Sequence, residues 1–474
     1  MNAPGMGGIG ARAGGGRPLA EAFVERLRTR FGDRFSTAAA VREHHGRDES
    51  PFEPVPPDAV VFATSTEDVV EAVKACQAFR VPLIPYGAGS SLEGHLLPIH
   101  GGVSVDLTRM NRVLAVQAED LTATVQAGVT RKQLNTEIRD TGLFFPIDPG
   151  ADATLGGMAS TRASGTNAVR YGTMRENVLA LTVVTADGKV IRTARRAKKS
   201  SAGYDLTRLF VGAEGTLGVI TEVTVKLYPQ PESISAAICN FPTVADAVRT
   251  TIQTIQLGIP VARCELLDAT GVRAVNAYSK LALRETPMLL FEFHGSATAV
   301  REQAEAVQHV ARDHHGLDFQ WATQPEERSR LWQARHNAYF ATLQLKPGSR
   351  AVSTDVCVPI SRLAECIGAT QEDLDRAPII TTIIGHVGDG NFHVQMIIDP
   401  NSPRDFEIAE ELNERLVKRA LSMDGTCTGE HGVGLHKMGF VVEEHGEDAI
   451  EMMARIKRAF DPLDIMNPGK VVRR

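Results

Sequence analysis

The fold is decided by residues 81–94, which read VPLIPYGAGSSLEG. A short apolar segment runs here into a loop of glycine, alanine and serine, whose small side chains let backbone N–H groups approach an anion closely. The loop contains Gly87 and Gly89, but it lacks the third glycine of a Rossmann motif and the Gly-Lys-Ser/Thr of a Walker loop. The stretch therefore predicts a phosphate-binding loop of neither common type, with an ordinary glycine-rich connector as the alternative.

Two more glycine-rich stretches follow in the first half of the chain. They read DPGADATLGG at 148–157, continued by ASGTN at 163–167, and GAEGTLG at 212–218. Three such loops need a common reason. A long dinucleotide held between strands would supply one, because the backbone would then contact its pyrophosphate, ribose and ring at separate points.

Length and charge exclude several classes of protein. The chain has 474 residues and a formal net charge of −6, so it is not a broadly basic nucleic-acid-binding protein. No apolar run approaches the roughly 20 residues that span a bilayer. The six cysteines lie far apart without a CxxC motif, which argues against a zinc ribbon or a disulfide framework and favours a reducing, cytoplasmic compartment.

Hydrophobic patterning divides the chain into four parts. We expect a disordered leader at 1–18, a first domain at 19–231, a second domain at 232–424, and a C-terminal segment at 425–474. The first domain should combine helices, such as one beginning after Ser65, with short strands. The second should be an α/β sandwich with strands near 234–241, 261–267, 288–294 and 351–358.

The motifs as a group resemble the FAD domain of the vanillyl-alcohol oxidase and p-cresol methylhydroxylase superfamily, also described as FAD-binding oxidoreductase/transferase type 4. The segments LWQARHNAYF at 331–340, GHVGDGNFHV at 385–394, GTCTGEHGVGLHKMGF at 425–440 and IKRAFDPLDIMNPGK at 456–470 are similar to the FAD-dependent, cytochrome-type D-lactate dehydrogenases. The resemblance implies an α+β fold with a two-subdomain FAD-binding module and a ferredoxin-like α/β sandwich for the substrate. It also implies that the C-terminal segment returns to the FAD module.

The resemblance implies that FAD is bound by residues of the three loops and of the C-terminal segment. Relatives that attach the flavin covalently do so through a His or Cys in the first loop, whereas this chain has Ser90 and Ser91 there, so we expect non-covalent FAD. The expected FAD-binding residues are Pro85, Tyr86, Gly87, Ala88, Gly89, Ser90, Ser91, Gly94, Asp148, Pro149, Gly150, Ala151, Thr154, Gly156, Gly157, Ser164, Gly165, Asn167, Tyr171, Gly172, Glu214, Gly215, Gly218, Ile220 and Asn467.

A metal site is predicted around His386 and His393. Asp389-Gly390 is a favoured two-residue turn between apolar segments, so residue 386 should pair with 393 and the two imidazoles should lie on one face, although a wider loop could also bring them together. Glu430, between glycines, would add a carboxylate, and such a set suits Zn²⁺ or Mn²⁺. The resemblance marks the same three positions as ligands. The alternative is two hydrogen-bonded histidines and a surface glutamate.

Two further residues are candidates for catalysis. His431 follows Glu430, and an unperturbed imidazole titrates near neutral pH, so we predict that it is the general base; the alternative is a core histidine. Arg335 falls on the inward stripe of a predicted helix that also includes Leu331 and Tyr339. A buried arginine needs an anion, which is either a structural carboxylate or the carboxylate of a substrate. The resemblance favours the substrate.

The predicted reaction is oxidation of a D-2-hydroxy acid, D-lactate to pyruvate in the first place, by hydride transfer to flavin N5. Ser353 and Thr354 stand where relatives with a dicarboxylate substrate tend to have a lysine, which favours a monocarboxylate. The sequence has no haem or iron–sulfur motif, so electrons should pass to a cytochrome, a quinone or an electron-transfer flavoprotein. Peripheral contact with the inner membrane and a homodimer remain open.

Three alternatives compete with this reaction. The closest is the flavin subunit of a glycolate oxidase or a D-2-hydroxyglutarate dehydrogenase-like enzyme. A second is a transferase resembling alkyl-dihydroxyacetone-phosphate synthase, which shares the FAD domain without net oxidation. A flavin-binding partner protein without catalysis would not need His386, His393, Glu430 and His431 together.

Overall fold

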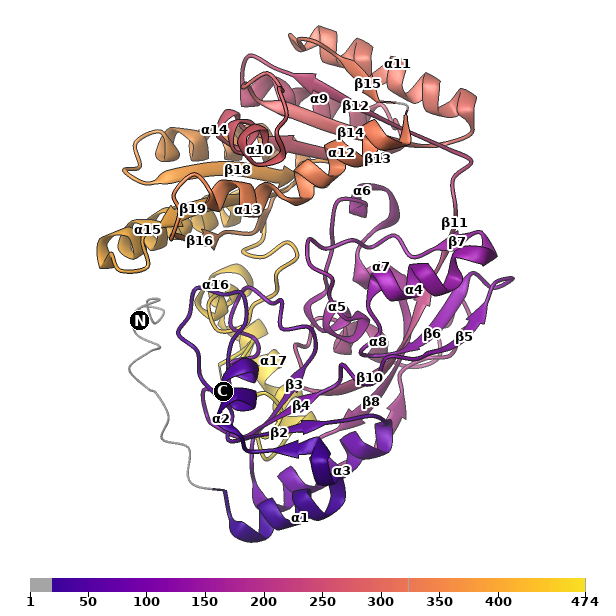
Figure 1. The fold of residues 1–474 in the computed structure, drawn as a ribbon, viewed down its shortest axis with the longest axis vertical. Coiled ribbons are helices and arrows are strands. Elements are labelled where there is room, and N and C mark those ends of the chain that lie inside the picture. Colours follow the sequence, from indigo (N-terminus) through magenta and orange to yellow (C-terminus); the bar gives the residue numbers. More distant parts are fainter. Residues whose placement is uncertain (1–18, 323, 474) are drawn as a thin grey trace. The chain divides into compact units, whose positions relative to one another are not determined.

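The computed structural model describes residues 19–322 and 324–473 (Figure 1). The leader predicted at 1–18 lies outside the described residues. The described chain divides into two compact units, each treated by itself below. Unit 1 contains the described residues up to Ser164, then Gly172–Gln230 and the residues from Glu430 onward, and unit 2 contains Gly165–Tyr171 and Pro231–Gly429.

Unit 1 is built on two main sheets. Its helices are α1 (Glu21–Phe31), α2 (Ala39–His45), α3 (Thr66–Phe79), α4 (Arg131–Ile138), α5 (Leu155–Thr161), α7 (Met174–Asn177), α8 (Leu206–Phe210), α16 (Met438–His445) and α17 (Glu447–Phe460). Its strands are β1 (Phe35–Ser36), β2 (Ala59–Phe62), β3 (Leu83–Tyr86), β4 (Val103–Asp106), β5 (Val113–Gln117), β6 (Thr122–Gln126), β7 (Leu143–Phe144), β8 (Val178–Thr185), β9 (Val190–Arg192), β10 (Gly218–Lys226) and β11 (Tyr228–Pro229).

The first sheet has the strand order β1-β2-β4-β3, with β2 and β3 parallel to β4. Helix α3 connects β2 to β3, and it begins as predicted, because the Ser65 side chain accepts a hydrogen bond from the backbone N–H of Asp68. Its buried residues Val69, Val73 and Cys76 pack in one cluster with α1 and with the strands. The sheet therefore presents β3 and the following loop at a fixed position.

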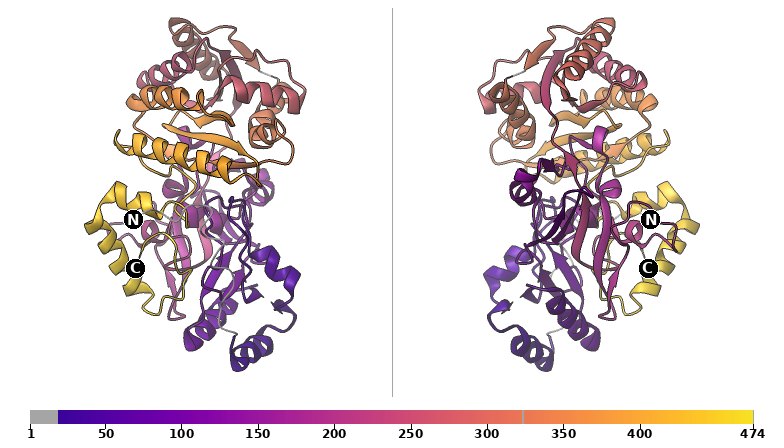
Figure 2. Two further views of the ribbon diagram at one scale, coloured as in Figure 1. Left: turned by 90° about the vertical axis from the view of Figure 1, so that its left-hand side faces the viewer. Right: turned by 90° about the vertical axis from the view of Figure 1, so that its right-hand side faces the viewer.

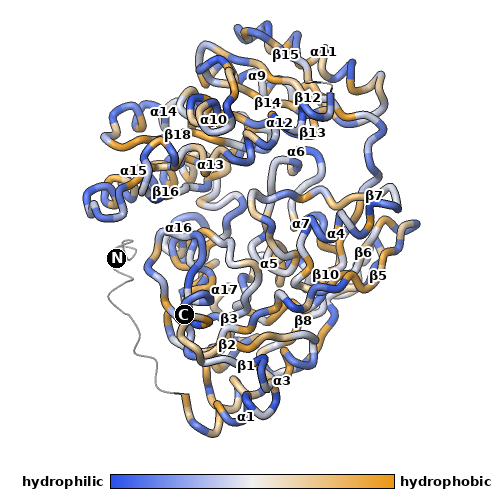
Figure 3. Tube along the Cα trace, in the orientation of Figure 1, coloured by the Kyte–Doolittle hydropathy of each residue, from blue (hydrophilic) through white to orange (hydrophobic). Residues whose placement is uncertain are grey.

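The second sheet of unit 1 is antiparallel, in the order β5-β6-β10-β8-β9. Strand β10 is central, and Val223 and Val225 on one of its faces are fully buried in the core. Hydropathy along the tube shows apolar stretches in the sheets of the unit (Figure 3).

The C-terminal segment packs on unit 1, beside strands from its beginning (Figure 2). Met466 forms a parallel bridge with Leu83 of β3. The buried Lys457 of α17 pairs with Asp461 at 2.6 Å and donates to the carbonyl of Thr216 at 2.8 Å. These bonds attach the segment to the first and third glycine-rich loops.

Unit 2 contains an eight-stranded sheet in the order β15-β12-β14-β13-β18-β19-β16, with β17 paired to β19. Its strands are β12 (Ser233–Asn240), β13 (Val261–Leu267), β14 (Met288–Gly295), β15 (Gln320–Ala322), β16 (Arg350–Ser353), β17 (Val356–Cys357), β18 (Ile380–His386) and β19 (Asn391–Ile398). Its helices are α6 (Ala168–Tyr171), α9 (Val244–Gln256), α10 (Ala269–Ser279), α11 (Ala297–Asp313), α12 (Pro325–His336), α13 (Ala338–Leu343), α14 (Leu363–Leu374) and α15 (Pro403–Leu421).

Helices cover both faces of this sheet. Helices α9, α11, α14 and α15 form one layer, and α10, α12 and α13 pack on the opposite face. On that second face, Leu267, Leu290, Trp332 and Ile384 belong to one hydrophobic cluster. Both units thus combine helices with sheets, which confirms the predicted α+β class.

The predicted strand at 351–358 is interrupted. It forms β16 and β17, separated by Thr354 and Asp355. The hydroxyl of Thr354 accepts the backbone N–H of Val394 at 2.8 Å, and the buried carboxylate of Asp355 accepts the Asn391 amide at 2.8 Å. Side chains thus replace ladder bonds at this point, and a pattern of apolar residues does not reveal such a replacement. Within the described part of the chain, no helix is both long and apolar enough to span a bilayer.

Candidate functional site

The three glycine-rich loops meet in unit 1. A Cβ atom on Gly87 would lie 2.5 Å from the hydroxyl oxygen of Thr154, which joins the first loop to the second. A Cβ atom on Gly215 would lie 2.9 Å from the ring of Pro85, which joins the first loop to the third. The expected residues of the three loops are therefore neighbours, and the absence of side chains is what allows the approach.

Asn467 connects the C-terminal segment to these loops. Its buried amide donates to the carbonyl of His95 at 3.1 Å and to that of Glu214 at 2.8 Å. Ser91 of the first loop donates to Asp48 at 3.1 Å. Unit 1 thus gathers most of the residues expected to bind FAD around one region.

Three expected FAD-binding residues, Gly165, Asn167 and Tyr171, belong to unit 2. The side-chain oxygen of Asn167 accepts a hydrogen bond from Arg263 Nε at 3.1 Å, and the Tyr171 hydroxyl is 2.7 Å from His294 Nδ1. These side chains are engaged by residues of strands β13 and β14, a setting that the glycine-rich pattern did not indicate.

The segment with His431 is held by a buried carboxylate of the third loop. Glu214 accepts the backbone N–H groups of Val433 at 2.7 Å and Gly434 at 2.8 Å. Glycine is required here, because a Cβ atom on Gly432 would lie 2.7 Å from Glu214 Oε1 and one on Gly434 would lie 2.1 Å from the carbonyl of Glu93. His95 is 3% exposed and its Nε2 lies 3.3 Å from Glu214; burial opposes protonation of His95, but Glu214 raises its pKa above the ordinary value.

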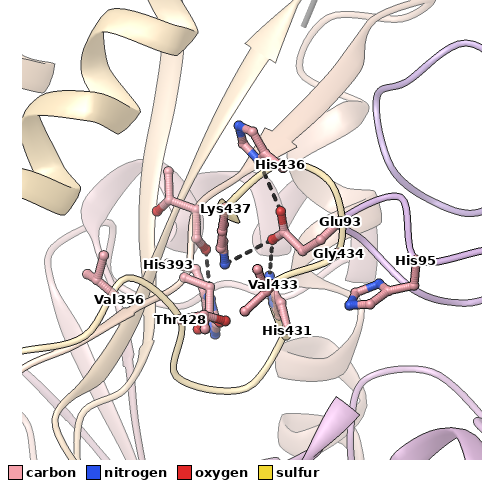
Figure 4. Close-up of polar contacts among 12 residues, drawn as sticks. Glu93, His95, Val356, His393, Thr428, His431, Val433, Gly434, His436 and Lys437 are labelled. Carbon is pink, nitrogen blue, oxygen red and sulfur yellow. Dashed lines mark hydrogen bonds and ion pairs between the residues drawn. The ribbon is translucent and has the colours of Figure 1, made fainter. Parts of the chain in front are cut away.

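A second buried carboxylate, Glu93, faces His431 directly (Figure 4). Its Oε1 lies 3.0 Å from Lys437 Nζ and 3.4 Å from His431 Nδ1, and its Oε2 lies 3.0 Å from His436 Nδ1. Glu93 and Lys437 are each 1% exposed. Burial acts against ionisation of Glu93, but Lys437 and the two histidines outweigh it and hold the pKa of the carboxyl well below its usual range.

The two histidines of the predicted metal site lie in unit 2, but in another register. Gly385 pairs with Phe392, so His386 pairs with Asn391 and Ile384 with His393, and the predicted pairing of 386 with 393 is wrong. The loop contains four residues, 387–390, and both residues beyond the predicted Asp-Gly turn precede Asp389. A shift of two residues leaves both rings on the same face, and their centroids are 5.4 Å apart with planes at 85°.

The Nδ1 atom of each histidine faces an acceptor. His386 Nδ1 donates to Glu265 Oε1 at 2.8 Å, and His393 Nδ1 donates to the carbonyl of Thr354 at 2.9 Å. Because a carboxylate and a carbonyl can only accept, these bonds assign the proton to Nδ1 and the lone pair to Nε2 in the neutral imidazoles. Nε2 is then the ligand atom that each ring offers.

Glu430 is the first residue of unit 1 after unit 2 ends at Gly429. Gly429 itself is held against Asn391, since a Cβ atom on it would lie 2.2 Å from the Asn391 amide nitrogen. The neighbouring Thr428 donates to Asp355 at 2.8 Å. The chain therefore leaves the β19 region of unit 2 one residue before Glu430.

Arg335 is buried, as predicted, at 8% exposure near the end of α12. The helix ends at His336, so Tyr339 belongs to α13 and not to the same stripe. Arg335 Nη2 pairs with Glu265 Oε2 at 2.6 Å, which is the structural carboxylate that the sequence left as an alternative. Among the described residues its buried Nε has no hydrogen-bond partner, so the guanidinium has donor capacity beyond this pair.

Sequence reasoning did not identify Glu93 or Glu265. It included Glu214 among the FAD-binding residues but did not predict that its carboxylate accepts backbone N–H groups. The signal for Glu265 was present: Arg263 and Glu265 alternate in the otherwise apolar strand VARCELL, as two charges do when one face of a strand is buried among polar partners. Glu93 ends a loop of small residues, where a charge also stands out.

Two family models match the chain. One is described as "FAD linked oxidases, C-terminal domain" and covers residues 230–471, and the other as "FAD binding domain" and covers residues 57–194. Among curated proteins, the chain is 52% identical to "Probable D-lactate dehydrogenase, mitochondrial" of Danio rerio, over 95% of this chain and 92% of that protein. It is 47% identical to "D-lactate dehydrogenase [cytochrome], mitochondrial" of Arabidopsis thaliana, over 95% of this chain and 80% of that protein.

A solved structure shows the same fold at low identity. It is p-cresol methylhydroxylase with substrate bound, with a TM-score of 0.78 and 18% identity over 96% of this chain and 98% of that chain. This likeness shows the fold that was expected from the motifs.

Replacing Glu93 by Gln should destabilise the protein at neutral pH. The substitution leaves the Lys437 ammonium buried without its counter-ion, and breaking such a pair costs about 3–5 kcal/mol of the free energy of unfolding. Because the folded-state pKa of Glu93 is lowered, its contribution to stability is fully present above the unfolded pKa, about 4.5, and is lost progressively as pH falls from there through the folded-state pKa. Urea denaturation of wild type and variant at pH 7 and pH 4 measures both effects.

The control is Glu451→Gln, since Glu451 is exposed and pairs with Arg455 at 2.9 Å on the helix surface. It should leave the unfolding midpoint unchanged. A Glu93→Gln protein as stable as wild type at pH 7 would contradict the assigned pair.

Proposed function

The chain belongs to the family of FAD-linked oxidases and is a FAD-dependent oxidoreductase, and from that premise we propose that it oxidises D-2-hydroxy acids, with D-lactate to pyruvate as its main reaction. The observation that carries the proposal is that the buried Arg335 and His386 both contact the Glu265 carboxylate, with the His393 ring 5.4 Å from the ring of His386. The D-lactate dehydrogenase relatives support the substrate.

FAD fits the meeting point of the three glycine-rich loops. Backbone approach at Gly87, Gly89 and Gly215 leaves no room for side chains, which is what close contact with a pyrophosphate requires. We propose that the loop residues predicted from the sequence hold it without a covalent bond. Bound FAD supplies the electron acceptor for the oxidation.

We propose that His386, His393 and Glu430 are the residues that would hold a divalent cation. Two imidazoles present Nε2 from one sheet face, and Glu430 follows a glycine that is held against Asn391 of the same sheet. Two histidines and a carboxylate suit Zn²⁺ or Mn²⁺ with a position left for substrate. Such a cation would act as a Lewis acid that lowers the pKa of the substrate hydroxyl.

We propose that Arg335 binds the substrate carboxylate with the guanidinium donors that Glu265 does not use. His431 removes the hydroxyl proton, and Glu93, 3.4 Å from its Nδ1, keeps that proton-bearing atom turned away from the substrate. Ser353 and Thr354 add no positive charge beside Asp355, which supports a monocarboxylate such as lactate.

The class of the electron acceptor is proposed from the name of a relative and from the sequence. The name of the Arabidopsis relative specifies a cytochrome, so we propose a cytochrome first, and a quinone or an electron-transfer flavoprotein as alternatives. Both relatives are described as mitochondrial, and that description applies to them. The cytoplasmic location, peripheral contact with a membrane and a homodimer stay predictions from the sequence.

Anaerobic flavin reduction tests the substrate class. We expect D-lactate to bleach the flavin absorbance faster than L-lactate, glycolate or D-2-hydroxyglutarate. Prior treatment with a chelator should slow the reduction by roughly 100-fold or more, because a Lewis acid is worth several kcal/mol in the transition state. Added Zn²⁺ or Mn²⁺ should restore it. Preference for glycolate or D-2-hydroxyglutarate would favour the closest alternative, and no bleaching by any hydroxy acid would favour the transferase.

Replacing His431 by Ala should leave the flavin spectrum intact and slow its reduction by D-lactate about 10²–10⁴-fold, the usual contribution of a general base. The matched control is His436→Ala, which removes another histidine from the same Glu93 carboxylate and should reduce at nearly the wild-type rate. Stopped-flow absorbance measures both. A wild-type rate in His431→Ala would remove the assigned base.

Replacing Arg335 by Gln should raise the KM for D-lactate about 10- to 100-fold, since hydrogen bonds to a charged group are worth about 1.5–3 kcal/mol. The amide can still donate to Glu265, so the fold should persist. Arg330→Gln on the exposed side of α12 serves as the control. Steady-state kinetics distinguish the two, and equal KM values would assign Arg335 to structure alone.

A further inference from the structure

Glu265 lies between the two groups on which substrate and metal binding are proposed to depend. It is 1% exposed and sits on β13. Its Oε2 pairs with Arg335 Nη2 at 2.6 Å, and its Oε1 accepts His386 Nδ1 at 2.8 Å. One carboxylate thus contacts a guanidinium of α12 and an imidazole of β18.

The sheet explains why these three side chains meet. Leu267 of β13 pairs with Ile384 of β18, so Glu265 and His386, each two residues along, lie side by side on the same face. Both Leu267 and Ile384 pack in the hydrophobic cluster that contains Trp332 of α12. Arg335 follows Trp332 by one helical turn, and it therefore reaches the polar end of this face.

Arg263, the other arginine near Glu265, has its own acidic partner. Arg263, two residues earlier on the same face, lies 3.4 Å from Glu292 and stacks over the ring of Trp332. Among the described residues, the carboxylate that pairs with Arg335 is Glu265, at 2.6 Å. The carboxylate is thus committed to Arg335 and His386.

The contacts of Glu265 with His386 and with Arg335 have different consequences. An ionised carboxylate only accepts, so its bond to His386 fixes the proton on Nδ1 and orients Nε2. Its bond to Arg335 anchors the guanidinium at Nη2 and leaves the other donors of that group for an anion.

We propose that Glu265 is a positioning residue that sets the orientation of both Arg335 and His386, so that cation binding and hydroxy-acid binding depend on the same carboxylate. This inference rests on the proposed function of those two residues. The competing view is a structural ion pair that stabilises unit 2. A structural pair would change the stability of the protein but not the affinity for a cation.

The test replaces Glu265 by Gln in the full-length, FAD-loaded protein. Glutamine replaces one of the two carboxylate oxygens by a donor amide and removes the negative charge, so Arg335 and His386 lose one acceptor and the charge-assisted character of both bonds. We expect an unchanged flavin spectrum and a Zn²⁺ dissociation constant raised about 10- to 100-fold, the usual effect of removing a residue that orients a ligand. The KM for D-lactate should rise about tenfold or more. Competition with a chromophoric chelator measures the first quantity, in the absence of substrate.

Asp246→Asn is the matched control. Asp246 of α9 is also a buried carboxylate between an arginine and a histidine, at 3.4 Å from Arg249 and 3.3 Å from His315. It should change the melting temperature but not the Zn²⁺ dissociation constant. Arg335→Gln should likewise retain Zn²⁺ while weakening lactate binding, because Glu265 still holds His386.

Each outcome decides a separate point. Zn²⁺ affinities of wild type and Glu265→Gln within twofold of each other would overturn the positioning role. A wild-type protein that takes up neither Zn²⁺ nor Mn²⁺ would contradict the proposed metal site itself. If Glu265→Gln does not fold, Glu265→Asp keeps the charge but is one methylene shorter and cannot span both donors. It should weaken Zn²⁺ binding as well, and wild-type affinity in that variant would overturn the inference.

Discussion

The carboxylate of Glu93 is removed from water, and it is balanced by Lys437, His436 and His431. Taking a carboxylate and an ammonium out of water costs several kcal/mol each, and only close, well-directed partners offset that cost. Since Glu93 belongs to the first glycine-rich loop and its partners to the C-terminal segment, the charge balance fixes the segment with His431 against that loop. The candidate base is therefore located by electrostatics more than by apolar packing.

The same constraint operates in unit 2. Glu265 must be matched by Arg335 and His386, and Asp355 by Asn391 and Thr428. Each carboxylate gathers donors from strands or helices that are distant in the sequence. Polar residues thus determine the arrangement at one end of a sheet face whose other end is apolar. Leaving the buried donors without these acceptors would lower the free energy of unfolding.

Local patterns were sufficient to predict much of the fold. Ser65 before an apolar stripe predicted α3 and its cap. The hairpin register was wrong by two residues. A period of two identifies the face of a strand but not its partner, so His386 and His393 were correctly placed on one face and incorrectly paired.

Less of the candidate site could be predicted from the sequence, because the acids that orient its side chains contact residues far away in the chain. Glu265 meets Arg335 70 residues away, and Glu93 meets His436 343 residues away. Neither partner can be read from local spacing. Motifs identified the groups that carry chemistry, whereas the acids that orient them appeared only as single charges among apolar or small residues.

The glycines of the segment 429–434 complete this argument. Gly432 and Gly434 both have positive φ values, and both approach buried glutamates so closely that a side chain would collide. Their role is to let Glu214 accept two successive backbone N–H groups, which a segment with side chains could not present. His431 is consequently positioned from both sides, by the Glu93 carboxylate at its ring and by Glu214 at the backbone that follows it.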